Sequence, residues 1–303
     1  MSGAFDAEKE AEALRKSVKG LGTADAELIS IVARLDDAQR DAVVRAYAKK
    51  YERDLVQDVH DDTSGNYRAL LEKLLVPREQ AMAVCLRESV RLLGTNDYQL
   101  LTLLTSFRDL IPAATECYKK MYDRSLLDDV RGDTSCNYRK TLAALVQRKP
   151  PPIGFVDAKL IPVDVEEFYK AGEKRLGTDE DAFIALLTGR SSEHLAEVDK
   201  EYKRLHGHTL TEAIASETSG NFGRTLTAIV TPHYERLARA VEHAIKGPGT
   251  QERLLHIVFA LSTREDLHRI AAEYKRLFKR DMAEAIKNDT SFNFRKLLLA
   301  LMA

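Results

Sequence analysis

Four acidic residues recur along the chain in one local pattern, and each could supply oxygen ligands to a metal ion. Each acid is followed by Thr, Ser, a variable residue, Asn and an aromatic residue, which indicates a loop carboxylate ahead of a helix start. The intervals between successive acids are 71, 84 and 72 residues, so the chain is a tandem array of four repeats. The four acids are Asp62, Asp133, Glu217 and Asp289.

A glycine turn precedes each acid at a nearly fixed distance. Its Gly-Thr pair begins 40 residues before the acid in repeats one, three and four, and 39 residues before it in repeat two. Glycine adopts positive φ at little cost, so such a turn can direct several carbonyl oxygens toward one point. Calcium accepts about 6–8 oxygens from carbonyls and carboxylates, whereas Mg²⁺ demands stricter geometry. The pairing therefore favours calcium sites with incomplete protein shells, open to water or to an external oxygen ligand.

Other interpretations of these motifs remain open at this point. Thr and Ser are common helix N-caps, so either loop taken alone could be a cap, although capping does not explain the fixed separation. A phosphate-binding loop is disfavoured because the turn lacks the Walker lysine spacing and no strand precedes it. We expect the Thr after each glycine to cap a helix whose first turn holds the next acid. Those acids are Asp25, Asp97, Glu180 and Glu252.

Composition and apolar spacing predict an all-α protein. The 303 residues are 44% apolar and 31% charged, and strand signals are poor. In repeat one, helical spacing of apolar residues predicts five short helices, over residues 7–18, from 23, over 37–50, over 54–61, and around 67–75. A formal charge of −1 gives no general attraction to nucleic acid or to an anionic membrane. No nucleophile–base constellation supports an enzyme.

Prolines and the repeat spacing predict the domain boundaries. We expect a short N-terminal tail (1–5), repeat one (6–76), repeat two (77–148), a Pro-rich linker (149–162), repeat three (163–231) and repeat four (232–303). The four repeats are expected to be arranged as halves around that linker. The chain shows no signal-peptide layout, no apolar run of about 18 residues, and three cysteines without a disulfide framework. A cytoplasmic protein fits these features best.

The four in-register motif pairs resemble those of the annexin family over essentially the whole chain. The resemblance implies a slightly curved disc of four five-helix repeats. It also implies calcium-dependent, reversible binding to acidic phospholipid surfaces such as phosphatidylserine, with Ca²⁺ bridging the protein and the headgroups. Such a protein would bind to membrane surfaces as a peripheral protein when calcium is raised, and copies of it could associate with one another there. A metal-independent helical scaffold for protein partners and, less favoured, a calcium-conducting channel are the alternatives.

The resemblance also assigns ligands residue by residue. The family's site falls on Val18, Gly20 and Gly22 with Asp62 in repeat one, on Gly172, Arg175 and Gly177 with Glu217 in repeat three, and on Ile245, Gly247 and Gly249 with Asp289 in repeat four. Each non-acidic ligand would contribute its backbone carbonyl. Beside these loops, the residues expected to contact lipid are Lys19, Leu21, Lys174, Leu176 and Lys246.

Several positions depart from the family pattern. Repeat two keeps only Gly94 of its loop glycines and has Asp133 one residue closer, so its site is expected to be weak or absent. Leu176 stands where some members carry an exposed Trp. Met82, Cys85 and Phe107 replace polar residues of the family's central channel, which disfavours ion conduction. Cys136 and Phe292 replace the Gly of the acidic motif, and we expect no chemical role for either.

Overall fold

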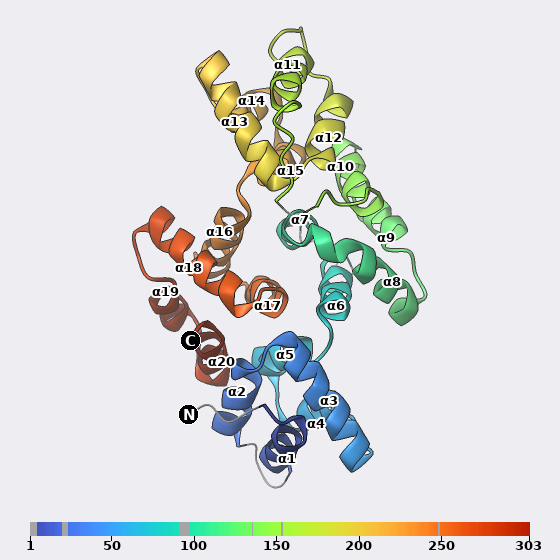
Figure 1. The fold of residues 1–303 in the computed structure, drawn as a ribbon, viewed down its shortest axis with the longest axis vertical. Helices are drawn as coiled ribbons and strands as arrows, with labels where there is room; N and C mark the ends of the chain where they lie inside the picture. Colours follow the sequence, from blue (N-terminus) through green and yellow to red (C-terminus); the bar gives the residue numbers. More distant parts are fainter. Residues whose placement is uncertain (1–4, 20–23, 91–96, 135, 153, 248) are drawn as a thin grey trace. The chain divides into compact units, whose positions relative to one another are not determined.

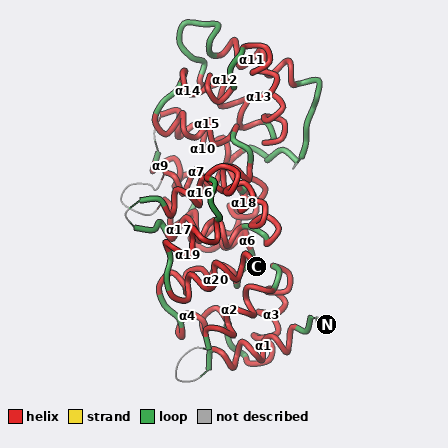
Figure 2. The backbone as a smooth tube through the Cα atoms, turned by 90° about the vertical axis from the view of Figure 1, so that its left-hand side faces the viewer, coloured by secondary structure: helices red, strands yellow, loops and turns green. Residues whose placement is uncertain are grey.

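The computed structural model describes residues 5–19, 24–90, 97–134, 136–152, 154–247 and 249–303. These residues form helices and loops without a strand, as Figure 2 shows, and the all-α prediction is confirmed. None of the described helices combines the length and the apolar character needed to cross a membrane.

Each repeat contributes five α-helices. Repeat one contains α1 (Ala7–Ser17), α2 (Asp25–Arg34), α3 (Asp37–Tyr51), α4 (Leu55–Asp62) and α5 (Gly65–Leu74). Repeat two contains α6 (Arg78–Val90), α7 (Asp97–Ser106), the 3₁₀ turn η1 (Arg108–Leu110), α8 (Ile111–Tyr122), α9 (Leu126–Asp133) and α10 (Cys136–Gln147). Repeat three contains α11 (Ile161–Ala171), α12 (Glu180–Gly189), α13 (Ser192–His206), α14 (Leu210–Glu217) and α15 (Gly220–Val230). Repeat four contains α16 (His233–Ile245), α17 (Glu252–Leu261), α18 (Arg264–Phe278), α19 (Met282–Asp289) and α20 (Phe292–Met302).

Apolar stripes and local caps account for these helices. In α2 the buried residues include Leu28, Ile31 and Val32, which recur at helical spacing. The helix α3 begins with a capping box in which Asp36 and Gln39 bond reciprocally. Helix α17 is buried along eight of its ten residues, so it packs on several sides.

The chain divides into two compact units, and the repeats are not paired as the sequence predicted. One unit comprises residues 1–82 and 238–303, and the other comprises residues 83–237, so repeat one packs with repeat four and repeat two with repeat three. In the first unit α20 packs against α2 and α5, and α17 packs against α5 (Figure 1). In the second, α15 packs against α7 and α10. The expectation of halves around the linker is therefore wrong.

The linker lies wholly inside the second unit because the start of α13 anchors it. The Asp157 N–H donates to His194 Nδ1 at 3.2 Å, and the Ser191 hydroxyl donates to the carbonyl of Phe155. On its other side, His194 Nε2 lies 2.8 Å from a carboxylate oxygen of the fully buried Asp164, which Arg190 also binds. These bonds join the connector to repeat three, so it does not separate two halves of the protein.

Candidate metal sites

The motif acid ends a helix in all four repeats. Asp62, Asp133, Glu217 and Asp289 are the last residues of α4, α9, α14 and α19. The next residue, always Thr, donates its hydroxyl to the carbonyl four residues back, for example from Thr290 to Ile286 at 2.6 Å. The acid is thus a helix C-terminal residue rather than a loop residue ahead of a helix. A carboxylate is unfavourable beside the negative end of a helix dipole, and a bound cation would relieve that repulsion.

In repeat three, the glycine loop contacts its acid directly. The Thr178 hydroxyl donates to Glu217 Oε2 at 2.6 Å and lies 3.3 Å from the Glu217 carbonyl oxygen. A β-carbon added at Gly172 would lie 3.4 Å from Glu217 Cγ and 3.2 Å from Phe183 Cζ. Gly172 therefore lets the backbone approach the carboxylate closely. Gly177 follows at a φ of +79°, where glycine is favoured.

Repeat four has the same arrangement. The Thr250 hydroxyl donates to Asp289 Oδ2 at 2.7 Å and lies 3.0 Å from its carbonyl oxygen. Gly247 and Gly249 have φ angles of +121° and +88°, positive values that glycine adopts at little cost. Ile245 ends α16 ahead of this loop.

These two contacts correct the role assigned to threonine. Asp179 is the N-cap of α12 and Gln251 that of α17, while Thr178 and Thr250 bind the carboxylates instead. The acids expected in the first helical turn are indeed there, since Asp25, Asp97, Glu180 and Glu252 each begin the second helix of their repeat.

The loop of repeat one is partly outside the described residues. Gly20, Leu21 and Gly22 lie outside them, as does Gly94 in repeat two. On either side of the loop, Val18 caps the end of α1 and the Ala24 N–H donates to the Ser17 carbonyl at 3.0 Å. Equivalent closing bonds join Gln251 to Ala244 in repeat four and Asp179 to Ala171 in repeat three. The bond from Asp179 to Ala171 encloses one more residue than the other two bonds, and Gly172 lies within the loop that it closes.

The described side chains that the sequence analysis expects to contact lipid are exposed. Leu176 is fully exposed, at 105%, and Lys19 and Lys246 are exposed as well. Lys174 Nζ lies 3.5 Å from a carboxylate oxygen of Glu166, so part of its charge is neutralised. Met82, Cys85 and Phe107 are buried.

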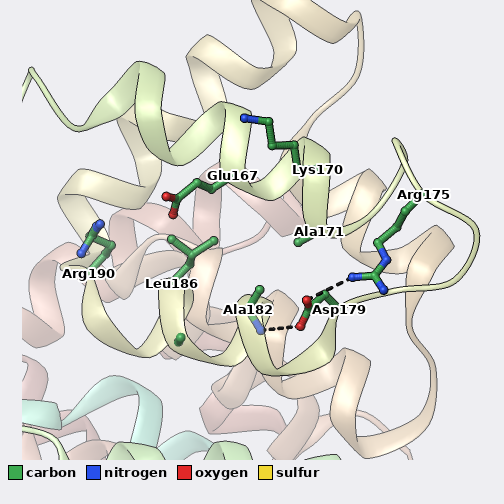
Figure 3. A pocket seen from close by; sticks show the side chains of 9 residues that line it. Glu167, Lys170, Ala171, Arg175, Asp179, Ala182, Leu186 and Arg190 are labelled. Carbon is green, nitrogen blue, oxygen red and sulfur yellow. Dashed lines mark hydrogen bonds and ion pairs between the residues drawn. The ribbon is translucent and has the colours of Figure 1, made fainter.

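Two surface hollows lie near these loops. One, of about 440 Å³, lies beside α11 and α12 and is lined by Arg175 and Asp179, which form an ion pair at 3.0 Å (Figure 3). It does not include Glu217. The other, of about 430 Å³, lies within the first unit and is lined by Thr250, Glu252 and Asp289, together with residues of repeat one. The second hollow gives the acid of repeat four access to solvent.

The donor set decides which metal these residues suit. Within the described residues, no group of three or more His, Cys, Asp or Glu side chains could hold a metal ion. Any ion bound here would draw its other ligands from backbone carbonyls, hydroxyl or amide side chains, water or an external molecule. One carboxylate combined with glycine-loop carbonyls suits calcium, which tolerates irregular oxygen shells, better than Mg²⁺ or a transition metal.

Comparison with known proteins accounts for this repeated geometry. The sequence pattern of the annexin family matches residues 9–74, 81–145, 163–229 and 236–301. Human annexin A4 is 35% identical over 301 residues, which cover 98% of this chain and 94% of that protein.

This chain belongs to the annexin family. Chicken annexin A5 is 33% identical over 303 residues, covering 98% of this chain and 94% of its own length. Among solved structures, annexin III superimposes with a TM-score of 0.92 at 33% identity, covering 99% of this chain and 94% of that one. A calcium-bound annexin (Sm)1 gives 0.88 at 27% identity, with coverages of 100% and 92%. The four matched segments coincide with the four repeats of this annexin.

Two features of the site were missed in the sequence. The Asn of the acidic motif was not assigned a role, yet Asn221 donates to Asp97 and Asn293 donates to Asp25. The Arg two residues after that Asn was also overlooked, although Arg295 donates to the Thr290 carbonyl at 2.7 Å, and Arg68 and Arg139 act alike. Recurrence of both residues in register was the available signal. In repeat three Gly223 replaces the Arg, and its backbone packs on Thr218.

Proposed function

We propose that this annexin binds acidic phospholipid membranes reversibly and in a calcium-dependent manner. The observation that carries the proposal is the contact of the Thr178 and Thr250 hydroxyls with the carboxylates of Glu217 and Asp289, across 39 residues in each case. It brings a glycine loop and an acid together in two separate repeats, as a mixed carbonyl–carboxylate site requires.

We assign the ligands in repeats one, three and four. They are the carbonyls of Val18, Gly20 and Gly22 with the carboxylate of Asp62, those of Gly172, Arg175 and Gly177 with Glu217, and those of Ile245, Gly247 and Gly249 with Asp289. The glycines orient the carbonyls, and the single acid supplies the protein's negative charge at each site. Calcium, when bound, supplies positive charge and open coordination positions for headgroup oxygens.

The charge of the protein makes its binding to an anionic membrane depend on calcium. The chain carries a formal charge of −1, which gives no general attraction to an anionic leaflet. Three divalent ions would change that charge to about +5 and place the added charge beside the exposed Lys19 and Lys246. We therefore expect the protein to bind membranes only when calcium is raised. We further propose that it is otherwise cytoplasmic and that copies of it associate with one another on the membrane.

The deciding experiment is co-sedimentation with phosphatidylserine vesicles at several calcium concentrations. We expect no sedimentation in chelator, and sedimentation with a calcium midpoint below the midpoint of calcium binding in solution. Lipid oxygens that complete the coordination shells must strengthen calcium binding, because coupling between two ligands is reciprocal. Equal midpoints with and without vesicles would contradict the bridging role. Binding that ignores calcium altogether would favour the metal-independent scaffold.

A further inference from the structure

Phe292 presents an aromatic ring to solvent next to the acid of repeat four. It is the first residue of α20, three positions after Asp289, and is 86% exposed. Asp289, Phe292 and Thr250 all line the same hollow of about 430 Å³. A large apolar side chain this exposed contributes little to folding through burial.

The backbone at Phe292 is held in a conformation that disfavours a side chain. Its φ is +48°, in the left-handed region, where a β-carbon is strained. Repeats one and three have Gly65 and Gly220 at this position, both at +61° and with no atom within 4 Å of an added β-carbon. Glycine would thus serve the fold here at lower cost, so folding does not explain the phenylalanine.

Bonds on both sides of Phe292 fix this conformation. Before it, Arg295 donates to the Thr290 carbonyl at 2.7 Å. After it, the Asn293 side chain donates to Asp25 at 2.5 Å. These bonds hold the backbone on both sides of Phe292, whose ring is exposed and lines the hollow.

We propose that Phe292 inserts into the interfacial region of an acidic phospholipid bilayer when repeat four binds it. The inference rests on the proposed function, because Asp289 would place the nearby ring at the membrane. Aromatic and large apolar side chains partition favourably into the boundary between headgroups and acyl chains. Removing a phenylalanine ring that is buried in the membrane interface should weaken binding to the membrane by about tenfold or more.

The test uses two substitutions at Phe292. Phe292→Gly should fold, because glycine occupies the corresponding turns of repeats one and three, and its melting temperature should be no lower than that of the wild type. Its partition onto phosphatidylserine–phosphatidylcholine vesicles at saturating calcium should fall by about tenfold. The protein contains no tryptophan, so Phe292→Trp adds a single fluorescent reporter. Its emission should shift to the blue with vesicles and calcium, be quenched by brominated lipid, and revert with chelator.

Phe155 provides the matched control. It is an exposed phenylalanine, at 52%, in the Pro-rich connector rather than beside a motif acid. Phe155→Gly should partition like the wild type, and Phe155→Trp should keep its emission when vesicles are added. The proposal is overturned if Phe292→Gly partitions like the wild type, or if Phe292→Trp emission stays unchanged while the protein sediments. A blue shift without vesicles that grows with protein concentration also overturns it, since the ring would then bind a second copy. Failure of the wild type to sediment would instead refute the proposed function.

Discussion

The side-chain amide of Asn293 donates a hydrogen bond to Asp25 Oδ2 at 2.5 Å, between residues 268 positions apart. Asn293 follows the acid of repeat four by four residues, and Asp25 begins the helix that follows the glycine loop of repeat one. In the other unit, Asn221 donates to Asp97 in the same way. Each unit thus joins the acid segment of one repeat to the glycine segment of its partner repeat.

Asn293→Ala should destabilise the unit formed by repeats one and four. It leaves the part-buried Asp25 carboxylate without this donor, and a hydrogen bond to a charged group contributes about 1–3 kcal/mol. Urea unfolding should report a loss of that size. Ser291→Ala is the matched control, because Ser291 is an exposed N-cap that makes no side-chain capping bond. Equal stability of the two variants would mean that the Asn293 contact is energetically unimportant.

Changing Asp62, Glu217 and Asp289 together to Ala should abolish calcium-dependent vesicle sedimentation. Each substitution removes the only carboxylate assigned to its site. Helix content by circular dichroism should be unchanged. In chelator, the loss of these three charges should not by itself lower the free energy of unfolding, because each acid ends a helix, where negative charge is unfavourable. Sedimentation that persists with calcium would show that other residues bind the ion.

Asp133 should be the least important of the four acids. In repeat two the buried Ser89 lies within α6, its hydroxyl bonded to the Cys85 carbonyl at 2.8 Å, whereas Gly172 ends α11 in repeat three. Repeat two thus continues its helix where repeat three turns toward its acid, and it has Leu92 where repeats one and four have their first loop glycine, so it lacks the first glycine of both loop types. Crystals soaked in calcium should show ions beside Asp62, Glu217 and Asp289 before any appears beside Asp133. Full occupancy at Asp133 with an empty site in repeat one or four would reverse this order.

His256 should make stability depend on pH in mildly acidic solution. Burial lowers its pKa from 6.5 to about 3, and the positive charge of Lys73 adds to the effect. Between these values the unfolded state binds the extra proton. The histidine's contribution is therefore fully present above pH 6.5 and is lost as pH falls toward 3, by about 1.4 kcal/mol per pH unit.

The measurement is the urea midpoint as a function of pH for the wild type and for His256→Leu. In His256→Leu, the urea midpoint should lack the fall between pH 6.5 and about 3 that the histidine causes. His268→Leu, which removes an exposed histidine of the same unit, should retain it. Parallel pH profiles for the wild type and His256→Leu would contradict the assignment.

The sequence by itself determined the repeats, the helices and the residue pairs of the sites. Residue intervals and apolar spacing depend only on order along the chain, and a helix fixes which side chains share a face. Repeat one accordingly has helices at Ala7–Ser17, Asp25–Arg34, Asp37–Tyr51, Leu55–Asp62 and Gly65–Leu74, close to the predicted ranges. The fixed separation of glycine loop and acid likewise anticipated that the two would meet.

Only the tertiary structure decided which repeats pack together and what each polar side chain binds. Apolar stripes such as those of α2 and α20 bury equally well against any complementary stripe, so they do not encode that repeat one joins repeat four. Thr250 could have capped a helix by its sequence, but folding places its hydroxyl 2.7 Å from Asp289. The left-handed turn at Phe292 is likewise held by Asn293, whose partner Asp25 comes into reach only once repeat four has packed against repeat one. Directional hydrogen bonds depend on distances that sequence order does not specify.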